Sequence, residues 1–213
     1  MEYEIGGPPS NLFLLTKLSP NDLCDLLHEV KNIKNNFNFY SDKKANSNLA
    51  GNLEKEYSLS QNSIDCLNKI VSPHVKKYNE INPLLTSVKV LDENLPLCLD
   101  KPWVNFQKKY EFNPVHNHKG IFSFVLWLEV PYYIKKEMEN PSSINSNNNC
   151  PGHFELLYTD IIGRIQTYKI AVDKNMENYL LIFPSQTYHC VYPFYTSEEY
   201  RISVSGNYVF KTK

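Results

Sequence analysis

The sequence predicts a mainly β protein, a jelly roll or small barrel, with α-helices packed against it near the N-terminus. Two helical patterns precede residue 85, and the hydrophobic period changes to two after it. About eight short apolar runs then follow, separated by Pro, Gly, Asn and Asp. Many strands after a few helices favour one β core with the helices outside it.

The first helical pattern covers residues 20–35, where five apolar side chains recur at helical spacing after Pro20. The second covers roughly residues 60–80, and Pro73 predicts a kink or a restart within it. Residues 1–84 are therefore expected to form a helical buttress.

The expected strands are rich in Val, Ile, Tyr, Phe and Trp, the residues that fit a half-buried pleated surface. They are residues 85–92, 102–112, 122–130, 153–160, 165–172, 178–185, 188–194 and 200–210. We expect residues 85–213 to form the jelly-roll core of a single domain. The polar, Asn- and Ser-rich segment 136–152 interrupts it as a mobile surface insertion or a lid.

Composition excludes several classes of protein. Apolar residues make up 42% of the chain, which indicates a globular protein, and the net charge of -1 lacks the basic surplus of a nucleic-acid binder. Five cysteines without a CxxC pair argue against a disulfide scaffold and for a reducing compartment. No signal peptide and no run of ~18 apolar residues is evident, so we expect a soluble cytoplasmic protein without a membrane segment.

The stretch PVHNHKG, residues 114–120, places two histidines two positions apart. In a strand, His116 and His118 would project from one face at ~6–7 Å and could share a metal ion. They could also be two exposed histidines on a strand rim. His189, 73 positions after His116, enters another expected strand and could supply a third ligand from the opposite side. Three histidines would leave coordination positions open for a substrate or oxygen.

Arg201 and Ser203 share one face of the last expected strand, with apolar residues on the other. An inward arginine is costly unless it meets an anion, and its fork fits a carboxylate with two hydrogen bonds. The partner could be a bound ligand or a carboxylate of the protein itself. Asn105 and Gln107 alternate with apolar residues in the strand before the histidines, where they could bind a co-substrate or lie on the surface.

Together these motifs resemble one family. The resemblance rests on the segments WVNFQKKYEFNPVHNHKGIFSFVLWLEVP, YLLIFPSQTYHCVYPF and RISVSGNY, with NLAGNLEKEYSL upstream. From about residue 47 on, the chain is similar to phage- and bacteria-encoded 2-oxoglutarate/Fe(II)-dependent oxygenases of the prolyl-hydroxylase-like group. The resemblance implies a double-stranded β-helix and Fe(II) held by an HxD or HxE pair and a distal histidine. It also implies 2-oxoglutarate as co-substrate, bound to the iron and to an arginine, and O2 as oxidant.

Carried over by position, His116 and His189 take the two histidine places of the metal and catalytic site. Arg201 and Ser203 take the places that hold the far carboxylate of 2-oxoglutarate. His118 stands where the family keeps a carboxylate, so the site would have one negative charge fewer. The implied reaction hydroxylates a C–H bond of a peptidyl or small-molecule substrate and converts 2-oxoglutarate to succinate and CO2.

Three alternatives remain open. His118 could begin an HxG motif with Gly120, which among relatives leaves a ligand place for a halide. A cupin-like three-histidine metalloenzyme would use HxH without 2-oxoglutarate and would leave Arg201 unexplained. A non-catalytic β-sandwich module of a phage, structural or binding, would need neither metal nor arginine. The sequence indicates neither the primary substrate nor the oligomeric state.

Overall fold

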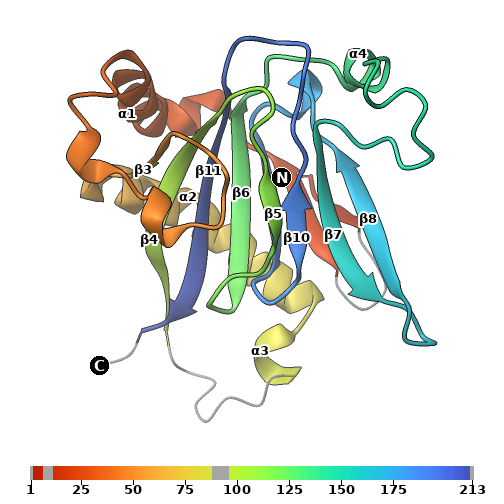
Figure 1. Ribbon diagram of the computed structural model, residues 1–213. Coiled ribbons are helices and arrows are strands. Elements are labelled where there is room, and N and C mark those ends of the chain that lie inside the picture. The colour runs from red at the N-terminus through yellow and green to blue at the C-terminus, as the bar shows by residue number, and fades with distance from the viewer. Residues whose placement is uncertain (1, 7–11, 88–95, 212–213) are drawn as a thin grey trace.

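The computed structural model describes residues 2–6, 12–87 and 96–211, and within them two antiparallel sheets face each other (Figure 1). The described strands of the larger sheet are, in spatial order, β1 (Glu4–Gly6), β2 (Phe13–Lys17), β9 (Tyr179–Pro184), β6 (Phe122–Glu129), β11 (Arg201–Phe210), β4 (Leu97–Gln107) and β3 (Glu56–Ser58). Those of the smaller sheet are β5 (Asn113–His116), β10 (His189–Val191), β7 (His153–Thr159) and β8 (Ile165–Ala171). This arrangement confirms the mainly β, double-stranded β-helix prediction.

Two long helices, over residues 24–35 and 61–81, cover the outer face of the larger sheet (Figure 1). The described α-helices are α1 (Cys24–Asn35), α2 (Gln61–Ile81), α3 (Leu84–Ser87) and α4 (Ile134–Met138). The helix over residues 61–81 runs through Pro73 as one element, so the expected restart does not occur. Leu67, Val71 and Val75 stay buried against the sheet, and this burial outweighs the one hydrogen bond that a proline removes. None of the described helices has the length and hydropathy to span a membrane.

The core has two layers, and β6 contributes to both. Phe124 and Leu126 pack on the helix side, while Val125 and Trp127 pack between the sheets. Because both faces of this strand are covered, its sequence reads as a continuous apolar run rather than an alternation. The second layer, which packs between the sheets, borders the cavity that holds the candidate site.

The structure corrects the expected strand at residues 85–92. Residues 84–87 form α3, and Leu84 and Leu85 pack on the helix-side core, so burial there replaces strand pairing. Residues 88–92 of that expected strand lie outside the described residues. Conversely, the N-terminal part supplies strands β1, β2 and β3 beside its helices.

The segment 136–152 is tied to the core at both ends. Buried Glu137 accepts hydrogen bonds from the backbone N–H groups of Tyr195 and Thr196, at 2.7 and 2.9 Å. Gly152 N–H donates to the Pro193 carbonyl at 2.8 Å. Both anchors hold the loop that leads into β11.

Candidate metal centre

Three imidazole rings converge between the sheets. His116 ends β5, His189 begins β10, and the two are Cα partners across the strand pair. One ring nitrogen of each of these residues and of His118 lies within 4.8 Å of the others. Such a set of three donors can share one cation with coordination positions left open.

His118 reaches the cluster from a loop, and not from the strand that the HxH spacing predicted. β5 stops at His116, and the His118 N–H donates to the Ser185 carbonyl at 2.8 Å. Gly120 then turns the chain with φ +114°, where an added Cβ would lie 2.9 Å from the Tyr208 carbonyl oxygen. The turn and the Ser185 contact bring the ring to the cluster.

Two of the rings are oriented by the backbone. Nδ1 of His116 lies 2.7 Å from the Pro114 carbonyl oxygen, and Nδ1 of His189 lies 2.9 Å from that of Thr187. With Nδ1–H donating, Nε2 of each ring presents its lone pair to the shared space. Within the described part of the chain, no hydrogen bond orients the His118 ring, which lies beside Trp103 with 5.8 Å between ring centroids.

Burial keeps the three rings neutral. It lowers the pKa of His116, lowers that of His118 to about 4, and lowers that of His189 well below its ordinary value. Neutral imidazoles need lose no proton before they bind a metal. Among the described residues no carboxylate joins the cluster, so its donors are all uncharged nitrogens. The residues fit a divalent metal of the kind that imidazole suits, including iron.

A polar strip on β4 and β11 runs away from the histidines. Trp103, Asn105 and Gln107 face Ser205, Ser203 and Arg201 as cross-strand partners, and all six line one cavity with the histidines. The Asn105 side-chain amide donates to the hydroxyls of Ser203 and Ser205 at 3.3 and 3.4 Å. The structure thus brings together every site residue that the sequence predicted.

Arg201 ends this strip as a buried cation, 2% exposed, with no carboxylate partner in the described structure. Its guanidinium donates to Gln107, the Tyr132 hydroxyl and the carbonyls of Gly152 and Tyr192. A buried charge held only by neutral acceptors is costly. The alternative of a protein carboxylate as its partner is therefore not realised among the described residues.

The sequence did not indicate Tyr132, Gly152 and Tyr192 as neighbours of the arginine. Each comes from a different segment, so no local pattern marks it. Phe154 and Phe183 were also missed as walls of the site; their rings lie 5.2 and 4.9 Å from that of His189. For Phe154 and Phe183 the sequence offered one signal, the alternation of side chains along a strand, which places every second residue on the face that His189 shares with its cross-strand partners.

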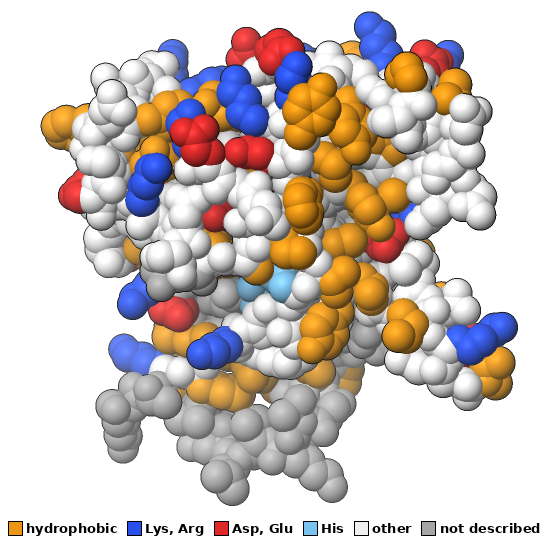
Figure 2. Space-filling model, viewed as in Figure 1, with side chains coloured by type: hydrophobic (Ala, Val, Ile, Leu, Met, Phe, Trp, Pro, Cys, Tyr) orange, Lys and Arg blue, Asp and Glu red, His pale blue; other side chains and the backbone are white. Residues whose placement is uncertain are grey.

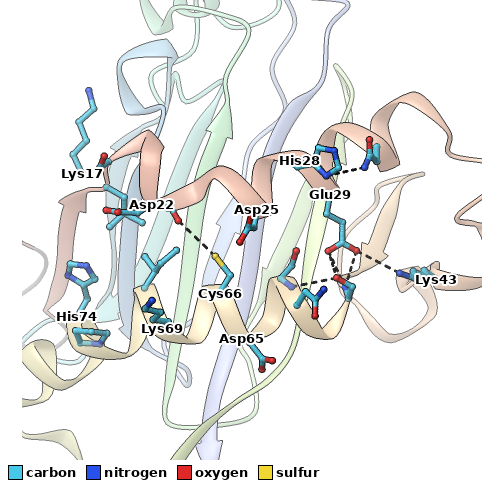
Figure 3. Close-up of a pocket in the computed structure, with 18 of the residues that line it drawn as sticks. Lys17, Asp22, Asp25, His28, Glu29, Lys43, Asp65, Cys66, Lys69 and His74 are labelled. Atoms are coloured by element: carbon cyan, nitrogen blue, oxygen red, sulfur yellow. Dashed lines mark hydrogen bonds and ion pairs between the residues drawn. The ribbon is translucent and has the colours of Figure 1, made fainter.

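The cavity between the sheets is small, about 40 Å³, and opens on the face seen in Figure 2, where histidine side chains are visible. A larger hollow of about 1310 Å³ lies between α1 and α2 (Figure 3), and none of its lining residues also lines the small cavity. Two of its charged residues serve the local structure: Glu29 accepts hydrogen bonds from the Ser60 N–H and hydroxyl and pairs with Lys43. Chemistry is therefore assigned to the small cavity.

Comparisons with known proteins identify the family of this chain. Residues 101–207 match the model of a family described as "Putative 2OG-Fe(II) oxygenase", a span of 107 of the chain's 213 residues. No curated protein matches the sequence.

Two solved structures are similar. A prolyl-4-hydroxylase from Pseudomonas putida is 13% identical, with a TM-score of 0.53 over 94% of this chain and 93% of that one. A 2OG-Fe(II) oxygenase family oxidoreductase from Burkholderia pseudomallei is 11% identical, with a TM-score of 0.44 over 98% and 73%. The first supports the fold. With the family match over the segment that holds all three histidines and Arg201, the chain belongs to the 2OG-Fe(II) oxygenase family.

Proposed function

We propose that this protein is an Fe(II)- and 2-oxoglutarate-dependent dioxygenase that hydroxylates a C–H bond of a peptidyl or small-molecule substrate. 2-Oxoglutarate would be converted to succinate and CO2 in the same turnover. One observation carries the proposal: a three-histidine cluster and a buried arginine that has no anionic partner among the described residues line the same cavity.

His116, His118 and His189 would hold the iron, which when bound supplies the activation of O2. The carbonyls of Pro114 and Thr187 keep His116 and His189 in the tautomer that binds metal through Nε2. The Phe154 ring, stacked on that of His189, excludes water from one side of the metal position.

Arg201 would bind the far carboxylate of 2-oxoglutarate, because it is the buried cation of the cavity. Ser203 and Asn105 lie one strand repeat nearer the histidines, about 7 Å along β11 and β4. Their hydroxyl and amide would orient the co-substrate between its two anchors.

His118 gives this centre a different charge from an HxD or HxE site. Three neutral donors leave the full charge of the metal on the complex, so we expect weaker discrimination between Fe(II) and metals that prefer nitrogen, such as Zn(II). The loop position of His118, without a ring hydrogen bond in the described structure, makes it the most adjustable ligand.

The test is anaerobic loading of the protein with Fe(II), followed by addition of 2-oxoglutarate and measurement of the visible charge-transfer band of the chelate. The proposal expects the band in the wild type and its loss in Arg201→Ala. Metal binding without any response to 2-oxoglutarate would instead favour a cupin-like three-histidine enzyme. No metal uptake would favour a non-catalytic module.

A further inference from the structure

The carboxylate-binding edge of Arg201 is already occupied by a neutral side chain. Nε and Nη2 both donate to the same oxygen, Oε1 of Gln107, at 3.2 and 2.6 Å. These are the two parallel N–H groups with which a guanidinium grips a carboxylate. The Gln107 amide therefore lies where a bound carboxylate would be expected.

The other N–H groups of Arg201 have partners as well. Nη1 donates to the Tyr132 hydroxyl at 2.6 Å and to the Gly152 carbonyl at 3.2 Å, and Nη2 donates to the Tyr192 carbonyl at 3.1 Å. With the two bonds to Gln107, all five donors of the guanidinium are used. An incoming anion can bind it only by displacing one of these partners.

Space leads to the same requirement. The cavity of about 40 Å³ is much smaller than the ~300–1,000 Å³ of typical ligand pockets. A side chain lining the cavity must move before a dicarboxylate can enter.

Three of the four partners of Arg201 are fixed. Backbone hydrogen bonds between the residues that follow β10 and those at the start of β7 hold the two peptide segments: Gly152 N–H donates to the Pro193 carbonyl, and Tyr192 N–H donates to the His153 carbonyl. The ring of Tyr132 stacks on that of Phe194, with 4.8 Å between the ring centroids. None of these groups can leave without breaking the sheet or the core.

Gln107 is the partner that can leave. It is the last residue of β4, it lines the cavity, and its long side chain is held beyond Arg201 by one hydrogen bond from Nε2 to the Glu111 carbonyl. A neutral amide accepts hydrogen bonds from a guanidinium more weakly than a carboxylate does. A dicarboxylate can therefore replace it, while the energy of the lost amide contact lowers the net affinity.

We propose that Gln107 is a gate on Arg201: its amide must swing away to admit the far carboxylate of the co-substrate, and it thereby sets the affinity for that co-substrate. This inference rests on the proposed function, since it takes 2-oxoglutarate as the ligand of Arg201. The apparent dissociation constant rises in proportion as the open state becomes rarer. Removing the gate should therefore tighten binding.

Isothermal titration calorimetry with 2-oxoglutarate tests this on protein loaded with Mn(II), which gives a binding readout without turnover. Gln107→Ala should bind at least about fivefold more tightly than the wild type, which corresponds to a gate open in a fifth or less of the molecules. Gln107→Asn, whose side chain is one methylene shorter, should also bind 2-oxoglutarate more tightly. It takes the place of the alanine variant if that variant folds poorly. Gln107→Glu should not bind, because its own carboxylate would occupy Arg201. Gln61→Ala, an exposed change at the start of α2, is the matched control and should equal the wild type.

The direction of the change in affinity for 2-oxoglutarate tests whether Gln107 acts as a gate. Weaker or unchanged binding in both Gln107→Ala and Gln107→Asn would overturn the gate, since Gln107 would then orient Arg201 or have no effect. Binding in these variants but not in the wild type would support it. Failure of every protein to bind 2-oxoglutarate, Gln61→Ala included, would overturn the proposed function itself and the gate with it.

Discussion

His116 and His189 are cross-strand partners whose imidazole rings lie 4.3 Å apart, centroid to centroid. The pairing of β5 with β10 therefore places two of the three proposed metal ligands in the smaller sheet. Hydrogen bonds of the backbone hold both rings, so the pair is preorganised before any ligand arrives. The third ring, His118, is added from a loop and is free to adjust.

Replacing His189 should abolish metal binding with the fold retained. The side chain is 3% exposed and packs on Phe154 and Phe183, so His189→Ala leaves a cavity that costs roughly 1–3 kcal/mol of stability. Titration with Fe(II) or Co(II) under anaerobic conditions, together with circular dichroism, measures both effects. His28→Ala, an exposed histidine on α1, is the matched control. Full metal affinity in the His189 variant would refute the ligand assignment.

Restoring a carboxylate at position 118 should change the metal preference. His118→Asp replaces a nitrogen donor with a carboxylate oxygen, the donor that suits Mn(II), so the affinity for Mn(II) relative to Zn(II) should rise by about tenfold. Competition between Mn(II) and Zn(II), followed by equilibrium dialysis, measures the ratio. An unchanged ratio would mean that the side chain at position 118 does not reach the metal.

The polar strip could be predicted because β4 and β11 are long and regular. Alternation in such strands fixes which side chains share a face, so Arg201 shares a face with Ser203, as expected, and the cavity side of the two alternatives is realised for Asn105 and Gln107. The same rule failed at His118, since strand β5 ends two residues earlier and a turn replaces the pleat. No local sequence pattern predicts where a four-residue strand ends.

The residues around Arg201 lay beyond prediction for a different reason. Tyr132, Gly152 and Tyr192 meet the guanidinium only through the packing of three separate segments. Strands β1 and β3 were also not predicted from the sequence, because three residues are too few to establish a period of two. Their pairing with longer strands is a tertiary effect.

Gly152 should tolerate no side chain. Its φ is +74°, and an added Cβ would lie 2.8 Å from the Tyr132 ring. Gly152→Ala should lose about 1–2 kcal/mol to left-handed backbone strain and roughly 1–3 kcal/mol more to overpacking. Gly163 is the matched control, with φ +82° and nothing within 4 Å of the added atom, so Gly163→Ala should show the strain alone. Urea denaturation measures the loss in free energy of unfolding for each variant. Equal losses would show that overpacking against Tyr132 does not destabilise Gly152→Ala.

Glu56 should make the stability of the protein depend on pH. The side chain is fully buried, and desolvation, with a smaller contribution from the charge of Glu111, raises its pKa from 4.5 to about 8. The folded protein therefore keeps this proton between pH 5 and 8, where the unfolded chain has lost it. Stability from this group is complete at low pH and is lost as the pH rises through about 8.

Glu56→Gln keeps the shape of the side chain and removes the titration. At pH 8 the variant should be more stable than the wild type by on the order of 2 kcal/mol, and at pH 5 the two should be nearly equal. Urea denaturation at both pH values measures the difference. Glu54→Gln, whose side chain is 70% exposed, is the matched control and should follow the wild type. A difference between Glu56→Gln and the wild type that stays the same at both pH values would show that Glu56 is ionised in the folded protein throughout this range.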